Sequence, residues 1–143
     1  MKTEDFQHLL LQAAVMAMAV DGKIADEEKQ ELARMAGSMA YFLGFDHAAV
    51  LPALLADTNN FGNNAIHRLT QTIQEGNLKP RQEATLIEVL LRIVEADSVV
   101  NSAEREMLRT LRPYLKQTDT ALLTRFPCLL KYMLSNSEDS LHV

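Results

Sequence analysis

The sequence predicts an all-α protein, a single helical bundle of about seven helices. Two observations support this fold class. Apolar residues recur at helical spacing along almost the whole chain, and no segment shows the strand-like alternation bounded by hairpin turns that a sheet requires. In addition, a chain of 143 residues, 48% hydrophobic and 23% charged, has the size and composition of one globular domain that buries its own core.

The expected helices follow from this periodicity and from residues that start or stop a helix. The first runs from about Glu4 to Val20 and is broken by Asp21-Gly22-Lys23. The next begins at Asp26 and ends near Gly44. A short helix after Asp46 contains Val50, Leu51, Leu54 and Leu55, and the next helix passes through Ile66, Leu69 and Ile73. A long helix then runs from Pro80 to Ala96, and another from Asn101 or Ser102 to about Pro113. In the last segment, from Asp119 to Leu134, Pro127 either kinks the helix or divides it into two short helices.

Composition and charge exclude several classes of function. A net charge of −5 without clustered Lys or Arg argues against nucleic-acid binding. No histidine has a second histidine or cysteine at metal-ligand spacing, which argues against a zinc site. There is no glycine-rich phosphate loop, and a hydrolase that uses Asp21 and Glu28 as acid and base lacks a recognisable substrate pocket. We therefore expect no catalytic residues and no enzymatic activity.

The apolar run from Leu9 to Ala19 resembles the core of a secretory signal. However, Glu4 and Asp5 precede it, and the run is too short to cross a bilayer. We interpret it as a core helix and expect no direct membrane insertion. The single cysteine, Cys128, lies in an apolar setting and is expected to be a small buried hydrophobe. One cysteine fits a reducing compartment, so we expect a cytoplasmic protein.

The most informative pattern is an internal repeat. Four pairs of equivalent residues are each 76 positions apart: Asp21 and Asp97, Ile24 and Val100, Glu28 and Glu104, and Leu32 and Leu108. An apolar helix precedes each copy and an amphipathic helix follows it, which predicts a duplicated helix–turn–helix. One domain over residues 1–143 would then comprise repeat one at about 4–57, repeat two at about 62–116, a C-terminal helical segment at 119–134 and a flexible tail at 135–143.

Each repeated turn brings an aspartate towards a glutamate that begins the next helix. Two neighbouring carboxylates repel each other unless a cation or a hydrogen-bond donor joins them. Carboxylate oxygens are ligands that Ca²⁺ and Mg²⁺ prefer, although the first half of an EF-hand loop is missing here. A second interpretation stays open, in which the carboxylates only cap helices; Asn101 and Glu104 have the spacing of a capping box.

The segments from Ala19 to Ile24 with Glu28, and from Glu95 to Val100 with Glu104, resemble the two acidic motifs of the TerB-like tellurite-resistance domain family. The resemblance covers roughly Phe6 to Leu115. It implies an all-helical fold with a duplicated core, and a divalent cation bound by Asp21, Glu28, Asp97 and Glu104. It also implies an adaptor that binds another protein in bacterial stress-response assemblies.

Two positions depart from the family pattern. The second copy has Asp97-Ser98 where the family has Asp-Gly, and serine does not adopt positive φ as readily as glycine. The first copy has Ala19 where the second has Glu95. A symmetric pair of cation sites and one composite or lopsided site therefore both remain open.

Overall fold

Helices and the short turns between them make up the part of the chain that the structure describes. The computed structural model describes residues 2–20, 26–42, 44, 46, 49, 52–53, 56, 63–96 and 102–133, and none of these residues lies in a β-strand. The α-helices are α1 (Thr3–Ala19), α2 (Asp26–Ser38), α4 (Asn63–Gly76), α5 (Pro80–Val94), α6 (Ser102–Leu111), α7 (Asp119–Arg125) and α8 (Leu130–Met133); the 3-10 turns are η1 (Ala40–Phe42), η2 (Arg112–Tyr114) and η3 (Pro127–Leu129). The predicted all-α fold class is confirmed.

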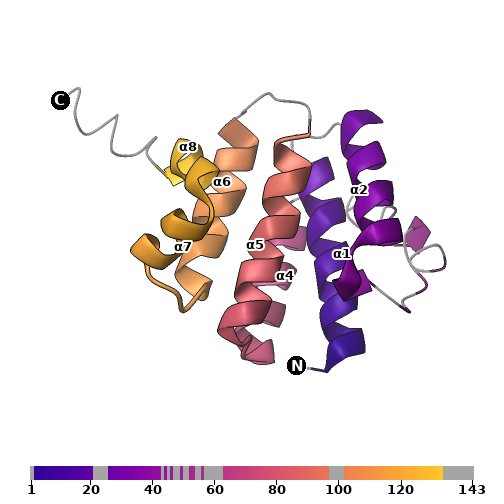
Figure 1. Ribbon diagram of the computed structural model, residues 1–143, viewed down its shortest axis with the longest axis horizontal. Coiled ribbons are helices and arrows are strands. Elements are labelled where there is room, and N and C mark those ends of the chain that lie inside the picture. Colours follow the sequence, from indigo (N-terminus) through magenta and orange to yellow (C-terminus); the bar gives the residue numbers. More distant parts are fainter. Residues whose placement is uncertain are drawn as a thin grey trace.

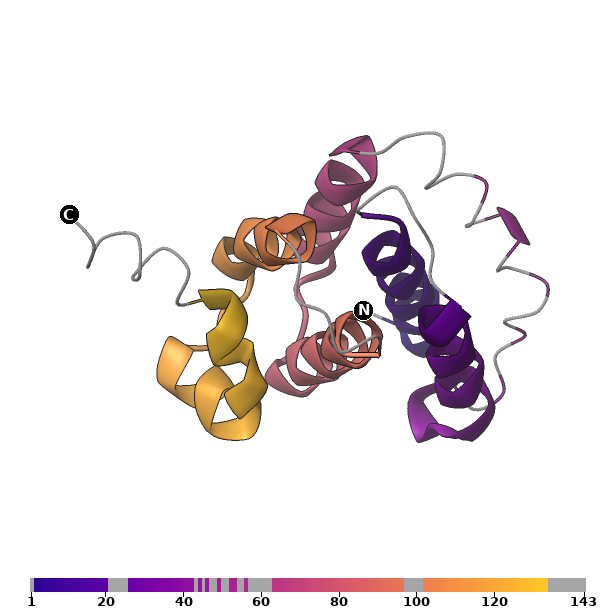
Figure 2. The ribbon, with the colours of Figure 1, turned by 90° about the horizontal axis from the view of Figure 1, so that it is seen from above.

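Helices α1 and α5 form the centre of the bundle. Buried side chains surround most of α1, including the consecutive residues Leu9, Leu10 and Leu11, because α2, α4 and α5 all pack against it. A helix that is apolar on nearly all sides is typical of a core position. The two central helices run in the same direction (Figure 1), and the view from above shows α2 on one side of α5 and the C-terminal helices on the other (Figure 2).

The C-terminal segment belongs to the same core. Leu122, Leu129 and Tyr132 are buried in the hydrophobic cluster that contains the centre of α1 and α5. The linker before α7 is held by the buried carboxylate of Glu83, on α5, which accepts hydrogen bonds from the backbone N–H groups of Lys116 and Gln117. These contacts attach α7 and α8 to α5.

Most predicted helix boundaries agree with the structure within two residues. The second helix is an exception, because it ends at Ser38, and Gly44 has a φ of +77°. The hydroxyl of Ser38 donates to the carbonyl of Arg34, and the 3-10 turn that follows brings Tyr41 against α5. Pro127 divides the last segment into two short helices, as one of the two predicted alternatives has it.

Two predictions fall largely outside the described residues. In the short helix expected after Asp46, Ala49, Pro52, Ala53 and Ala56 are helical, whereas Val50, Leu51, Leu54 and Leu55 are not described. The tail at 135–143 lies outside as well. In the part of the chain that the structure covers, no helix combines the length and the apolar character that crossing a membrane requires.

Candidate functional site

Glu28 and Glu104 occupy the same position in their helices. Each is the third residue, of α2 and of α6 respectively, and their exposed fractions are only 3% and 2%. Leu32 and Leu108, which are equivalent to each other in the repeat, are also buried and lie one helical turn after the glutamates. The register predicted for these pairs therefore holds at both helix starts. Asp21 and Asp97 lie outside the described residues, so the approach of each aspartate to its glutamate, and the duplication itself, stay predictions.

A buried carboxylate must be compensated. Removing a charged group from water costs several kcal/mol unless hydrogen-bond donors or an opposite charge replace the water. The positive end of the helix dipole offsets about 0.3–1 kcal/mol of that cost for a carboxylate in the first turn. Both Glu28 and Glu104 take part in further hydrogen-bonding or electrostatic interactions in the structure, in addition to the helix dipole.

The helix ends that flank the two acidic turns lie at one end of the molecule. Figure 1 shows the C-terminal ends of α1 and α5 and the N-terminal ends of α2 and α6 together at the top of the bundle. This arrangement follows from the parallel direction of α1 and α5, because each is followed by a helix that runs back. Both glutamates are thus presented at the same end of the bundle.

A tyrosine from the C-terminal segment contacts Glu95, the acidic residue that follows α5 and lies near Glu104. The hydroxyl of Tyr132, on α8, donates to Oε1 of Glu95 over 3.1 Å, and Glu95 is the residue at which α5 ends. Burial raises the pKa of Tyr132 above its ordinary value, and the negative charges of Glu95 and Glu104 raise it further. Both carboxylates consequently lie near a single hydroxyl.

Sequence reasoning left Glu95 unassigned and missed Tyr132. The two residues are 37 positions apart, and no local pattern connects them. Glu88 lies two helical turns before Glu95 and therefore on the same face of α5, and it has a similar partner, since Tyr41 donates to it over 2.7 Å. Burial and this hydrogen bond raise the pKa of Tyr41 as well. Two tyrosines therefore donate to carboxylates at this face of α5, Tyr41 to Glu88 and Tyr132 to Glu95.

Cys128 is half-buried, whereas the sequence predicted a buried side chain. It packs against the core and borders a shallow groove with Glu88, Arg92 and Glu95. It lies in the 3-10 turn between α7 and α8, which Pro127 begins.

The described residues do not form a metal site by themselves. Among them, no group of three or more His, Cys, Asp or Glu side chains is arranged to hold a metal ion. A complete set of protein ligands at the acidic end of the bundle thus requires Asp21 or Asp97 in addition to the buried glutamates.

Comparison with known proteins places most of the chain in a family. Residues 7–124 match the family model described as tellurite resistance protein TerB. No curated protein matches the chain, and no solved structure matches it. The matched span begins within α1, includes both acidic turns and the helices α2, α4, α5 and α6, and reaches into α7.

Proposed function

Because the chain belongs to the TerB family of tellurite-resistance proteins, we propose that it is a non-enzymatic adaptor domain that binds a divalent cation, Ca²⁺ or Mg²⁺, through its acidic inter-helix turns. The ligands would be Asp21, Glu28, Asp97 and Glu104. The domain would act in the cytoplasm in a bacterial stress response, by binding another protein.

The supporting observation is the pair of buried glutamates at one end of the bundle. Glu28 and Glu104 have exposed fractions of 3% and 2%, and in the sequence each follows a turn that contains an aspartate. A divalent cation would relieve the repulsion that arises where each aspartate approaches the glutamate of the same turn. Carboxylates this deeply buried also offer little surface to a substrate, which supports a binding role rather than catalysis.

One observation favours a metal-free scaffold as the second candidate. The third residue of a helix is the position from which a glutamate side chain returns to the N-cap backbone N–H in a capping box. Both glutamates occupy that position. In this case the acidic residues only start two helices, and the domain binds its partner without a cation.

Thermal unfolding with Ca²⁺, Mg²⁺ and Mn²⁺, compared with EDTA, separates the two candidates. A cation that binds only the folded protein stabilises it by about 2.7 kcal/mol at one hundred times its Kd. We expect this stabilisation in the unmodified protein and its loss in an Asp21→Asn/Asp97→Asn double variant.

A matched control is Glu27→Gln/Glu106→Gln, which also removes two negative charges, from exposed positions on α2 and α6, the helices that follow the two acidic turns. This control should keep the cation response. The scaffold candidate predicts no stabilisation at millimolar cation in any form, and a cost of at most about 1 kcal/mol for each Asp→Asn change. Either that result, or an unchanged cation response in the Asp→Asn variant, contradicts the proposal.

A further inference from the structure

The thioether sulfur of Met39 lies where the end of α2 meets α5. Met39 directly follows α2: its backbone N–H donates to the carbonyl of Met35, and its own carbonyl accepts from Phe42 at the end of η1. Two hydrogen-bond donors contact the sulfur, namely Nη1 of Arg92, on α5, at 3.3 Å and the hydroxyl of Tyr41. A weak acceptor is therefore placed between two stronger donors.

Met39 is also a methionine that solvent reaches. Among the methionines whose side chains the structure describes, it alone is partly exposed, whereas the others are at most 3% exposed: Met16, Met18, Met35 and Met107. Oxidation of a thioether by a peroxide follows its exposure, because a buried sulfur reacts only after local unfolding. The described part of the chain thus offers a peroxide one accessible thioether.

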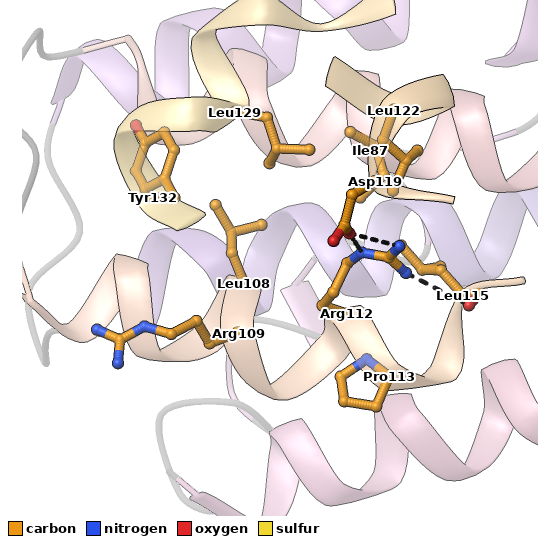
Figure 3. A pocket seen from close by; sticks show the side chains of 10 residues that line it. All are labelled: Ile87, Leu108, Arg109, Arg112, Pro113, Leu115, Asp119, Leu122, Leu129 and Tyr132. Atoms are coloured by element: carbon orange, nitrogen blue, oxygen red, sulfur yellow. Dashed lines mark hydrogen bonds and ion pairs between the residues drawn. The ribbon is translucent and has the colours of Figure 1, made fainter. Parts of the chain in front are cut away.

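Arg92 is placed differently from the arginines that form ion pairs. Arg112, for example, lies beside a cavity of about 270 Å³ between α5, α6 and the C-terminal helices, and its guanidinium contacts Oδ1 of Asp119 at 2.7 and 2.8 Å (Figure 3). Among the described residues, no carboxylate lies within ion-pair distance of Arg92, and its guanidinium contacts the sulfur of Met39 instead. A stronger acceptor than a thioether at this position would therefore improve the contact.

We propose that Met39 is a site of oxidation by peroxide, and that Arg92 binds the oxygen of the resulting sulfoxide. The sulfur forms a bond to one oxygen of hydrogen peroxide, the O–O bond breaks, and the proton of the bound oxygen passes to the departing hydroxide, which leaves as water. The sulfur is oxidised and the peroxide is reduced; methionine sulfoxide reductases reverse the change.

The sulfoxide group is polar, and its oxygen is a better acceptor than the sulfur that it replaces. Arg92 is exposed, so the end of its side chain is free to shift and donate to this oxygen. A hydrogen bond from a charged donor is stronger than one between neutral groups. The end of α2 would consequently stay attached to α5 after oxidation, at a contact that involves η1 as well.

Treatment of the full chain with hydrogen peroxide, followed by peptide mass mapping, tests the site. EDTA is present throughout, so the result does not depend on cation binding by the acidic turns. We expect Met39 to gain one oxygen atom about tenfold faster than the buried methionines Met16, Met18, Met35 and Met107. Equal rates at Met39 and at these buried positions would overturn the proposal.

Urea denaturation of the oxidised and the unoxidised chain tests the role of Arg92. Oxidation should change the urea midpoint of the unmodified sequence little, because Arg92 binds the new oxygen. In Arg92→Ala the same oxidation should lower the midpoint, because the polar group at the α2–α5 contact has lost its charged donor. Arg81→Ala removes another exposed arginine from α5 and should respond to oxidation as the unmodified sequence does.

Two results would contradict the binding of the sulfoxide by Arg92. The first is a midpoint change in oxidised Arg92→Ala that is no larger than the change in oxidised Arg81→Ala. The second is a change that persists in Met39→Leu/Arg92→Ala, since another methionine would then be its source. Circular dichroism of the unoxidised variants confirms that they are folded, and the mass mapping tests the oxidation site without any variant.

Discussion

The linker that leads into the C-terminal helices is bound to α5 by a buried carboxylate, that of Glu83. Its exposed fraction is 1%, and its oxygens accept from the backbone N–H of Lys116 at 2.8 and 3.1 Å and from that of Gln117 at 3.3 Å. Glu83→Ala removes the acceptor of both donors. We therefore expect this substitution to destabilise the whole domain, because Leu122, Leu129 and Tyr132 belong to the common core.

The magnitude follows from the two donors. A hydrogen bond to a charged group contributes about 1.5–3 kcal/mol, and the donor on the exposed Lys116 can regain a water molecule after the substitution. The lower end of that range applies to each bond, so Glu83→Ala should lower the free energy of unfolding by about 3 kcal/mol. Glu83→Gln keeps one uncharged oxygen as acceptor and should cost about half as much.

Urea denaturation followed by circular dichroism measures this difference, and Glu106→Ala is the control. The side chain of Glu106 is 70% exposed and its ion pair with Arg109 is long, at 3.7 Å, so its removal should change the free energy of unfolding by less than about 0.5 kcal/mol. A loss for Glu83→Ala that is no larger than the loss for Glu106→Ala would refute this account of the C-terminal attachment.

Two further predictions concern the tyrosines on α5 carboxylates. Tyr132→Phe removes the hydrogen bond to Glu95 but keeps the buried ring, so the free energy of unfolding should fall by about 1–3 kcal/mol in urea denaturation, and an unchanged value would contradict the assigned bond. Burial raises the pKa of Tyr41 and Tyr132 above the ordinary 10.0 in the folded protein. As the pH rises, these hydroxyls therefore lose their protons in the unfolded chain first, and the stability that they contribute at lower pH is lost. Stability should therefore decline above pH 10, and the decline should be shallower in Tyr41→Phe/Tyr132→Phe; equal slopes would contradict the prediction.

The helices could be predicted from the sequence because their signals are local. The nearly continuous apolar run in α1 and the Pro80 that begins α5 define the two central helices without knowledge of their neighbours. The spacing of 76 residues predicted equivalent positions for Glu28 and Glu104, and each is the third residue of a helix; their burial was not predicted.

The contacts between distant segments could not be predicted in the same way. Glu83 and Lys116 are 33 residues apart, and Tyr132 and Glu95 are 37 residues apart. Neither pair shares a helix or a turn, so no periodicity relates them, and their contact depends on how α7 and α8 fold back onto α5. The cavity has the same origin, since α5, α6 and the C-terminal helices each contribute part of its wall. The end of α2 at Ser38 also depends on a distant contact, that of Tyr41 with Glu88.

Paramagnetic broadening by Mn²⁺ in amide NMR spectra tests the proposed cation site most directly. Mn²⁺ takes the same oxygen ligands as Mg²⁺ and broadens the signals of nearby residues. If the acidic turns hold the cation, the amides of residues 26–28 and 102–104 should broaden first, and a composite site would broaden both groups at the same Mn²⁺ concentration. Broadening that spares both helix starts, or that persists there in Asp21→Asn/Asp97→Asn, would contradict cation binding by these turns.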